Sequence, residues 1–573
     1  MRLKKLSLLS MLVMSTMTAC MQDEFDNLQD QVNDLNEQVT DLNGKVGELE
    51  EMQQQALMQA IAELQSSLDS MSSSNAEKYN GLLENLKLIE DEVANNEAAV
   101  YYGNLLKDED FDAFMAQGAT ILTGKVTLSS QSQVEALVNA KMIGGSLTIK
   151  GEVGNVMLPN LENIGEDLMI QEVSGETSIQ FEKLSTVGGA FYVVENPGLT
   201  EVLANGIAVI NHELYVEANN VLTTLSLSTL DKVQNIYINE YWAADPNYYG
   251  FGALANLNLS GTDVSSDVYI SYLAREAGTL SLGKIGGSFT CIYTGLSSIE
   301  ISGDMVNGDF IVENNIVLSS IVADNLKHVE GQLSIGHNDN GIVWDAIEKT
   351  GLETMPAFSK LEYIGGDVSI QFNGAMTTMD AFNNVTEVKG DNIYIGFNGL
   401  TEFINVFNTL EQTGASQYSN ASITVDEKTN WFTGFNALTE ALHINVSISK
   451  PSEDTGGGIS AFSTVSDIAK LEGFNNITAV STLRLNLTEV TDFNAFAALE
   501  NFKNFQTYLY VYLPSDTNVG LCAMEPILAK VKNGDFDISY NPNRKAVFYD
   551  NATYSEVDRD TAIDRLTYPC NQN

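Results

Sequence analysis

The stretch IGGDVSIQFN, Ile364–Asn373, decides the fold of this chain because close copies of it recur along the sequence. It returns as IGGSLTI from Ile143, as VGGAFYVVEN from Val187 and as VKGDNIYIGFN from Val388. Most copies begin about 21 to 24 residues after the previous one. A period of about 20 to 29 residues with one strand per copy is typical of a solenoid, in which each coil buries the apolar side of its neighbour.

Each copy has the parts of one solenoid coil. The pair Gly144-Gly145 permits a tight turn where side chains would collide. Leu147-Thr148-Ile149 then alternates apolar and polar residues, which directs one face into the stack. The leucine-rich stretch Leu158–Gly165 closes the coil. We therefore expect a mainly β chain, with the solenoid at 121–545 interrupted by insertions.

Asparagine recurs three residues past the last apolar residue of many predicted strands. Its amide can bond main-chain groups of adjacent coils, and asparagine tolerates left-handed turns. We predict a structural asparagine corner, with a calcium or glycan site as the alternative. The series is Asn196, Asn219, Asn315, Asn338, Asn373, Asn398 and Asn541.

The combined motif resembles those of receptor L-domains and leucine-rich-repeat-like solenoids. The resemblance is carried by VGG-x-φ-x-φ-x-x-N (φ, apolar) after L-x-x-L-x-x-φ-G, as in Leu158–Gly165 and Leu361–Gly365. It implies a right-handed parallel β-helix that binds proteins or builds surfaces. It transfers no ligand residues, because binding residues vary freely in such folds.

The N-terminus reads as an export signal, with basic residues before the short apolar run Leu6–Met14. Met17–Cys20 resembles the lipobox of bacterial lipoproteins. This resemblance implies removal of residues 1–19, acylation of Cys20 and a lipid anchor in the outer membrane. The alternative is an ordinary signal peptide followed by a free cysteine. The acidic residues Asp23, Glu24 and Asp26 after Cys20 also resemble a surface-export signal of some Gram-negative lipoproteins, with simple solvation as the alternative.

Residues 20–100 are predicted to form an acidic α-helical coiled-coil stalk, followed by a linker at 101–120. Valine at a and leucine at d favour a parallel dimer, so we expect a homo-oligomer, with a trimer as an alternative. A second apolar series, Leu57 to Met71, is one residue out of phase. A helical hairpin within one chain, turning at Ser72–Asn75, is the other alternative. The a/d series is Phe25, Leu28, Val32, Leu35, Val39, Leu42, Val46 and Leu49.

The composition is strongly acidic. The 573 residues include 29 Lys and Arg against 76 Asp and Glu, a formal net charge of −47. This charge argues against nucleic-acid binding, which needs basic contacts to phosphates. It keeps molecules apart unless divalent cations such as Ca²⁺ bridge them.

No motif indicates catalysis. The four histidines have no metal-ligand spacing, and no nucleophile elbow, phosphate loop or dinucleotide fingerprint is present. We therefore expect no enzyme activity, no resident metal and no cofactor. A polysaccharide-active enzyme is the third-ranked function.

Aromatic residues at three places are candidate contacts with a protein or glycan partner. The alternative is that they cover inserted loops or the end of the solenoid. Tyrosine and tryptophan are favoured at interfaces. The candidates are Tyr241, Trp242, Tyr248 and Tyr249 in one insertion, Trp431 in another, and Tyr508, Tyr510 and Tyr512 on one strand face.

Residues 546–573 lose the repeat and are predicted to cap the solenoid, closed by a Cys522–Cys570 disulfide. Cys291 is expected to be a buried, inert thiol. Together these features predict a surface-exposed lipoprotein with a structural or adhesive role, including assembly into a coat such as a surface layer. The alternative is a glycan-binding lipoprotein of an uptake system.

Overall fold

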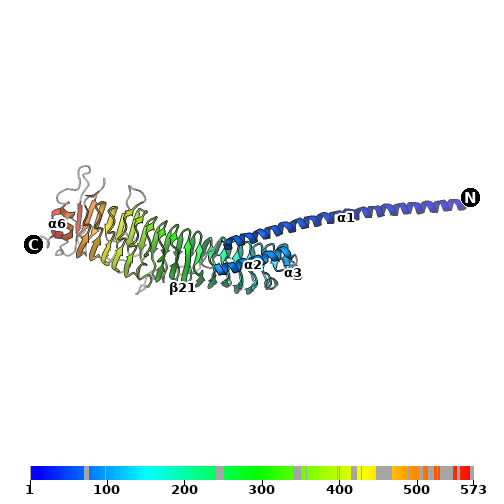
Figure 1. The fold of residues 1–573 in the computed structure, drawn as a ribbon, viewed down its shortest axis with the longest axis horizontal. Coiled ribbons are helices and arrows are strands. Elements are labelled where there is room, and N and C mark those ends of the chain that lie inside the picture. Colours follow the sequence, from blue (N-terminus) through cyan, green and yellow to red (C-terminus); the bar gives the residue numbers. More distant parts are fainter. Residues whose placement is uncertain are drawn as a thin grey trace.

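The chain forms a parallel β-solenoid of about 15 turns with a long helix projecting from its N-terminal end (Figure 1). This computed structural model agrees with the solenoid predicted from the repeats. It describes residues 2–69, 76–96, 99–240, 251–339, 350–356, 358–396, 398, 401–414, 422–426, 429–446, 468–487, 490–499, 501–502, 508–513, 522–525, 527–529, 546–550 and 555–567.

Three parallel faces, A, B and C, run along the solenoid. Face A contains β1 (Val100–Tyr101), β2 (Ile121–Leu122), β4 (Met142–Ile143), β7 (Asn163–Ile164), β10 (Thr186–Val187), β13 (Val209–Ile210), β16 (Lys232–Val233), β19 (Thr262–Val264), β21 (Ala277–Ile285), β24 (Met305–Val306), β27 (His328–Val329), β29 (Tyr363–Ile364), β32 (Glu387–Val388) and β35 (Gln412–Thr413).

Face B is the longest. It contains β3 (Val126–Leu128), β5 (Leu147–Gly151), β8 (Leu168–Val173), β11 (Phe191–Val194), β14 (Glu213–Glu217), β17 (Asn235–Asn239), β20 (Val268–Ser271), β22 (Phe289–Ile292), β25 (Phe310–Glu313), β28 (Leu333–Gly336), β30 (Val368–Gln371), β33 (Asn392–Gly396), β36 (Ser422–Asp426), β38 (Glu440–Val446), β40 (Ala479–Asn486), β43 (Tyr508–Tyr512) and β44 (Ala546–Asp550). The short strand β42 (Asn501–Phe502) pairs with the start of β40.

Face C contains β6 (Val156–Met157), β9 (Thr177–Gln180), β12 (Leu199–Leu203), β15 (Thr224–Ser226), β18 (Asn256–Asn258), β23 (Leu296–Ile301), β26 (Ser320–Val322), β31 (Thr378–Ala381), β34 (Thr401–Val406), β37 (Thr429–Gly434), β39 (Lys470–Gly473) and β41 (Asp492–Ala495). The long strand β21 serves two faces, because its first part pairs with β23 and its last residue with β24.

The opening motif supplies both the turn and the buried face of a coil. In β30, Val368 and Ile370 point inward, and Ser369 lies between them at the surface. A Cβ on Gly365 would collide with the carbonyl oxygen of Glu330 in the preceding coil, so this close approach requires glycine.

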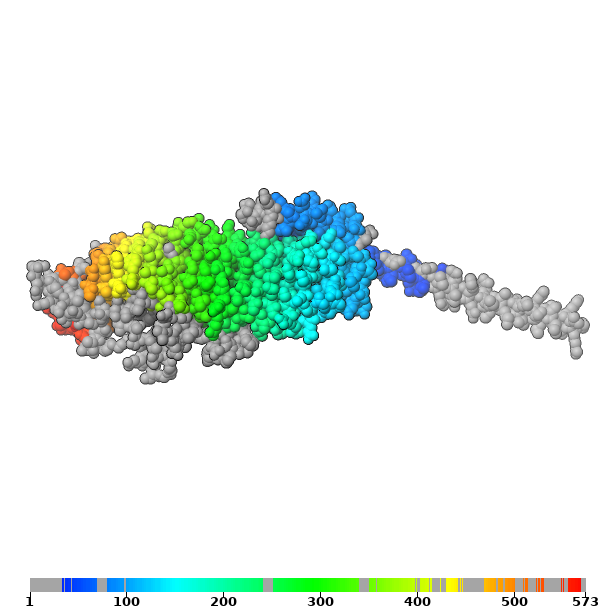
Figure 2. Space-filling model, turned by 90° about the horizontal axis from the view of Figure 1, so that it is seen from below, coloured from blue at the N-terminus to red at the C-terminus, as the bar shows by residue number. Residues whose placement is uncertain are grey.

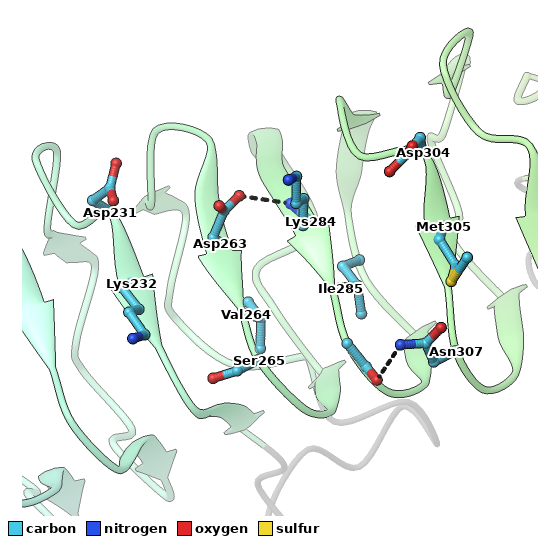
Figure 3. A pocket seen from close by; sticks show the side chains of 11 residues that line it. Asp231, Lys232, Asp263, Val264, Ser265, Lys284, Ile285, Asp304, Met305 and Asn307 are labelled. Atoms are coloured by element: carbon cyan, nitrogen blue, oxygen red, sulfur yellow. Dashed lines mark hydrogen bonds between the residues drawn. The ribbon is translucent and has the colours of Figure 1, made fainter. Parts of the chain in front are cut away.

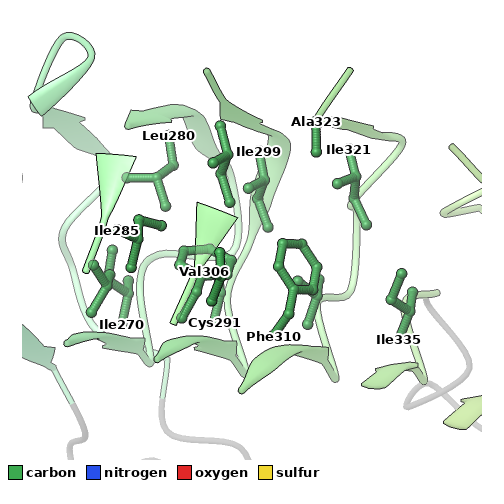
Figure 4. Packing of buried hydrophobic residues seen from close by; sticks show 14 of the residues in the cluster. Ile270, Leu280, Ile285, Cys291, Ile299, Val306, Phe310, Ile321, Ala323 and Ile335 are labelled. Carbon is green, nitrogen blue, oxygen red and sulfur yellow. The ribbon is translucent and has the colours of Figure 1, made fainter. Parts of the chain in front are cut away.

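The core is one continuous apolar column inside the three faces. Figure 4 shows Val306 from face A, Ile299 from face C and Phe310 from face B directed into the same interior. Because each coil is narrow, its apolar side chains are covered by those of adjacent coils as well as by its own.

The N-terminal helices form a hairpin on face A. The end of α1 (Arg2–Asp69) and α2 (Ala76–Asn95) pack against each other and against the first coils, as Figure 2 shows for the blue segment. Leu57, Ile61 and Leu64 are buried in this contact. The hairpin alternative therefore describes the second half of the predicted stalk, where α1 packs on α2.

The outward-pointing residues of face A differ between the coils that the hairpin covers and the coils beyond it. In the two-residue strands β1, β2 and β4 the first residue points away from the core, and the hairpin buries these residues, which are Val100, Ile121 and Met142. Beyond the hairpin the same position is Lys232 and then Asp263, both partly exposed. The helices exclude water from this position over the first coils, which favours an apolar residue there, although Met305 further along face A is apolar and 38% exposed.

The segment 101–120, predicted as a linker, is instead part of the solenoid. β1 pairs with β2, and α3 (Asp108–Gln117) places Phe111 and Phe114 against the open end of the core. α4 (Gln131–Ala136) packs beside α3. Gly118 ends α3 with a left-handed φ of 70°.

The C-terminal end is closed by a different device. β45 (Ser555–Val557) pairs antiparallel with β44, which interrupts the parallel stacking. α6 (Arg559–Thr567) buries Ala562, Ile563 and Leu566 in the core cluster, and the 3₁₀ helix η4 (Cys522–Met524) lies beside it. Among the described residues, no helix combines the length and apolarity needed to cross a bilayer.

Candidate binding surfaces

The six predicted corner asparagines in the described residues are buried and hydrogen-bonded between coils. The Asn315 Nδ2 donates to Asn338 Oδ1 at 3.0 Å, and the Asn373 Nδ2 donates to Asn398 Oδ1 at 2.8 Å. The Asn196 Nδ2 donates to Asn219 Oδ1 at 2.8 Å. Groups that bond each other this completely have little capacity left for a ligand. Asn541 lies outside the described residues.

The left-handed residue at this corner is not the asparagine, as the sequence suggested, but its predecessor. Glu195, Ala218, Asn314, His337 and Phe372 all have φ between 54° and 58°. The turn therefore rotates the preceding side chain outward, while the asparagine amide points into the stack. His337 and Phe372 stack outside with ring centroids 4.5 Å apart.

A second corner carries a phenylalanine series that the repeat analysis missed. Its members are buried, have left-handed backbones and stack with ring centroids 5.0 to 5.4 Å apart along most of the series. They are Phe358, Phe382, Phe407, Phe435, Phe474 and Phe496. The recurring sequence signal is Phe followed three residues later by Leu, Val or Ile, as in FNNV from Phe382.

Face B also carries a tyrosine series that sequence reasoning missed. Tyr192, Tyr215, Tyr237 and Tyr269 are in register on four adjacent strands. The rings of Tyr215 and Tyr237 stack at 4.7 Å, and those of Tyr237 and Tyr269 at 5.2 Å. Because the ring faces cover each other, the row presents mainly ring edges and hydroxyls to solvent.

Carboxylates accept hydrogen bonds from two of these hydroxyls. The Tyr192 hydroxyl donates to Glu213 at 2.9 Å, and the Tyr215 hydroxyl donates to Glu217 at 2.6 Å. Burial and the bond to Glu213 raise the pKa of Tyr192 to about 12. The bond to Glu217, with burial, raises the pKa of Tyr215 further above its usual range. Both phenols therefore stay neutral donors at physiological pH.

Of the predicted aromatic contacts, Trp431 is the best defined, and its ring is already occupied. The ring centroid of Phe403 lies 4.8 Å from that of Trp431. The ammonium of Lys470, which is on β39, lies 4.2 Å from the Trp431 ring centroid. Its indole Nε1 donates to Glu472 at 2.7 Å. The residue is 38% exposed, but its neighbours restrict access to the ring faces that a sugar would stack on.

The remaining aromatic candidates lie partly or wholly outside the described residues. Tyr241, Trp242, Tyr248 and Tyr249 lie outside the described residues. Tyr508, Tyr510 and Tyr512 lie at alternate positions of β43. The side chain of Tyr512 is half-buried, and those of the other two lie outside the described side chains.

A hollow of about 390 Å³ lies on face A just beyond the hairpin (Figure 3). Asp231, Asp263 and Asp304 alternate along it with Lys232 and Lys284. Charges of both signs thus line its rim. Its lining contains no histidine, cysteine or catalytic pairing of a nucleophile with a base.

Two buried titratable groups, Glu240 and Cys291, lie elsewhere. The Glu240 carboxylate accepts bonds from the Asn219 backbone at 2.7 Å and side chain at 2.9 Å, and burial raises its pKa to about 7. Cys291 is a free, fully buried thiol whose pKa burial raises to about 12. The His337 ring is at the surface, and its partial desolvation lowers its pKa. No cluster suited to a metal ion occurs among the residues the structure describes.

The N-terminal part of α1 presents an apolar row to solvent. Leu35, Leu42 and Leu49 are 63%, 62% and 54% exposed, and Val39 and Val46 lie between them. These are the a and d residues of the predicted coiled coil. Cys20 falls within the helical backbone of α1.

The cysteines near the C-terminus are partly described. Cys522 begins η4 and is disulfide-bonded. Cys570 lies outside the described residues, so its pairing with Cys522 stays a prediction.

Comparisons with known proteins give no family for this chain. No family model matches the sequence. No solved structure matches it significantly.

Proposed function

We propose that this protein is a lipid-anchored surface protein of the outer membrane that presents its solenoid for structural or adhesive protein contacts. The acylated Cys20 is the anchor in this proposal, and the solenoid is the right-handed coil typical of receptor L-domain-like proteins. The proposal assigns the chain no catalytic activity and no resident cofactor.

The projecting part of α1 is the observation that carries this proposal. The helix leaves the N-terminal end of the solenoid and runs outward from it, with the proposed anchor near its far end (Figure 1). Residues 20–52 would span about 50 Å at about 1.5 Å per residue. Such a rod holds the solenoid clear of a bilayer, where faces B and C and the part of face A beyond the hairpin are accessible to partners.

Assembly into a coat is the specific form we propose for these contacts. With a net charge of −47, neighbouring solenoids repel each other unless cations lie between them. Calcium prefers carboxylate and carbonyl oxygens, which this surface supplies. We therefore expect lateral assembly to require millimolar Ca²⁺.

Two experiments test the proposal. Protease treatment of intact cells should remove the solenoid, and its protection would contradict surface exposure. Light scattering of purified full-length protein in detergent should show assemblies larger than the basal oligomer with Ca²⁺ and their loss with a chelator. A size unchanged by calcium at high protein concentration would contradict the coat.

Glycan binding is the second candidate function, and the tyrosine row on face B is the feature that favours it. Its hydroxyls and the flanking Glu213 and Glu217 form a linear set of donors and acceptors. Replacing Tyr215 and Tyr237 by phenylalanine keeps the rings and removes these hydroxyls. Loss of binding on a polysaccharide panel in this variant, with the fold intact, would favour the glycan function over the coat.

A further inference from the structure

We infer that the exposed face of α1 from Leu35 to Leu49 is the interface for a second copy of this chain, in a parallel two-stranded coiled coil that ends where α1 reaches the solenoid. The parallel orientation rests on the proposed anchor, because both copies would then leave the membrane in the same direction. The interface itself rests on the four observations below.

The apolar row is long, regular and uncovered. Val39 and Val46 occupy a positions and Leu35, Leu42 and Leu49 occupy d positions, with exposed fractions between 47% and 63%. Alternation of valine at a with leucine at d favours two strands over three or four. A single solvated helix gains nothing from this arrangement, because each exposed apolar side chain remains in contact with water.

The charges on this helix are placed for self-association. From Phe25 to Leu49, no acidic residue occupies an e or g position, which flank the seam. The e and g residues are Gln29, Gln31, Asn36, Gln38, Asn43 and Lys45. The acidic residues are confined to the outer b, c and f positions and are Asp26, Asp30, Asp34, Glu37, Asp41 and Glu48.

The separation of acidic residues from the apolar seam indicates that the partner helix is a second copy of this chain. Two copies of a chain with 76 acidic and 29 basic residues repel each other at most surfaces. From Phe25 to Leu49 the seam and its borders carry no carboxylate, and Glu50, the next e residue, would face the Lys45 g position of the second copy, so an identical helix can approach without like-charge contact. The amide-rich borders can instead hydrogen-bond across the interface.

The helix also needs a partner to persist. In its projecting part, a Cβ built on Gly44 or Gly47 would meet no neighbouring atom within 4 Å, and each of these glycines weakens helix formation by about 1 kcal/mol relative to alanine. Isolated helices are marginal in water and depend on packing of an apolar face. Both glycines occupy outer positions, f and b, where a second strand does not reach.

A one-residue phase change ends the interface. Leu49 closes the exposed row and Leu57 opens the buried one, eight residues later. At about 100° per residue, the two rows point roughly 80° apart. The first row is therefore free to meet a partner helix while the second packs on face A, where Leu57 lies against Gly144.

Site-specific crosslinking of the full chain in its native membrane tests this interface. In a parallel, in-register pair each d residue faces its own copy, so Leu35→Cys and Leu49→Cys should both give crosslinked dimers on oxidation. The matched control Asp41→Cys, at an outer c position on the same helix, should not crosslink. Native cysteines are common to all three proteins and set the background.

The possible results separate the alternatives. Leu35 and Leu49 lie about 21 Å apart along the helix, so an antiparallel pair cannot crosslink both sites. Crosslinking at only one, or equal crosslinking at Asp41→Cys, would overturn the inference. Sedimentation of the detergent-purified protein should give the mass of two chains, and the double variant Val39→Asp/Leu42→Asp should give the mass of one. A particle of three chains would also contradict the two-stranded interface. If both cysteine variants crosslink but the solenoid on intact cells is protected from protease, the helix interface is supported and the proposed surface exposure is contradicted.

Discussion

Asn338 shows how one side chain joins three coils. Its Nδ2 donates to Val312 O at 2.8 Å and to Asn373 Oδ1 at 3.2 Å, and its Oδ1 accepts from Asn315. Asn338→Ala leaves buried groups of these neighbours without their partner, at a cost of about 1 to 3 kcal/mol for each unsatisfied group. We expect chemical denaturation to show a loss of about 3 kcal/mol in unfolding free energy.

The control for that variant is Asn325→Ala. Asn325 is exposed, and its Nδ2 donates to Ser302 O at 3.3 Å near solvent. Water can replace such a bond, so this change should cost less than about 0.5 kcal/mol. Equal losses in the two variants would show that the buried asparagine corner adds no stability of its own.

The raised pKa of Glu240 predicts that the free energy of unfolding depends on pH. Its pKa is about 7 in the folded chain because of burial, with a further contribution from Glu217, against 4.5 for the ordinary carboxyl. The folded state therefore binds the proton more tightly, and stability falls as the pH rises from about 4.5 to about 7. The loss amounts to roughly 3 kcal/mol at pH 8.

Replacing this carboxylate should remove the effect. Glu240→Gln keeps an acceptor for Asn219 without a buried charge, so unfolding free energy should rise at pH 8 and change little at pH 5. Glu176→Gln, at an exposed position, should retain the pH dependence of the unchanged protein. A parallel shift of the whole pH profile in Glu240→Gln would contradict this account.

At the scale of elements, the hairpin on face A is held by a narrow apolar contact. Ile61 is buried between α2 and the first coils, so Ile61→Asp would bury an unpaired charge unless the hairpin leaves the sheet. We expect undocking, seen as faster amide exchange at Ile121 and Met142 and faster proteolysis of α2. Gln55→Asp, on the exposed side of α1, should leave both rates unchanged.

The solenoid elements were predictable because their physics is local and repeated. Each copy of the motif carries its own glycine turn, as at Gly365, and its own alternating strand, as at Val368–Gln371. The phenylalanine corner was harder to see, since insertions vary the distance between its members. Phe435 and Phe474, for example, are 39 residues apart but stack at 5.0 Å.

The docking of the hairpin could not be read from α1 alone. A row such as Leu57, Ile61 and Leu64 suits a second chain or a sheet equally well, because both offer an apolar surface at helical spacing. The deciding signal lay on face A, where Met142 is apolar at the position that is charged at Lys232. Only a known register relates these two residues, and the structure supplies it.

At the scale of the whole molecule, stacking and charge act against each other. The apolar column favours adding coils, but each coil also adds acidic side chains to a stack whose paired strands lie only about 5 Å apart. Ion pairs offset little of this repulsion. Lys125 and Glu166 are 3.2 Å apart but both more than half exposed, and such pairs contribute about 0 to 1 kcal/mol.

This imbalance predicts that salt stabilises the molecule. The screening length falls from about 30 Å at 0.01 M ionic strength to about 8 Å at 0.15 M, which weakens repulsion between coils more than the short contacts between paired charges. We expect the Tm, measured by circular dichroism in the strand region, to rise by several degrees over this range of sodium chloride. A Tm that falls with salt would mean that ion pairs outweigh repulsion, and the acidic faces would then not hold separate molecules apart.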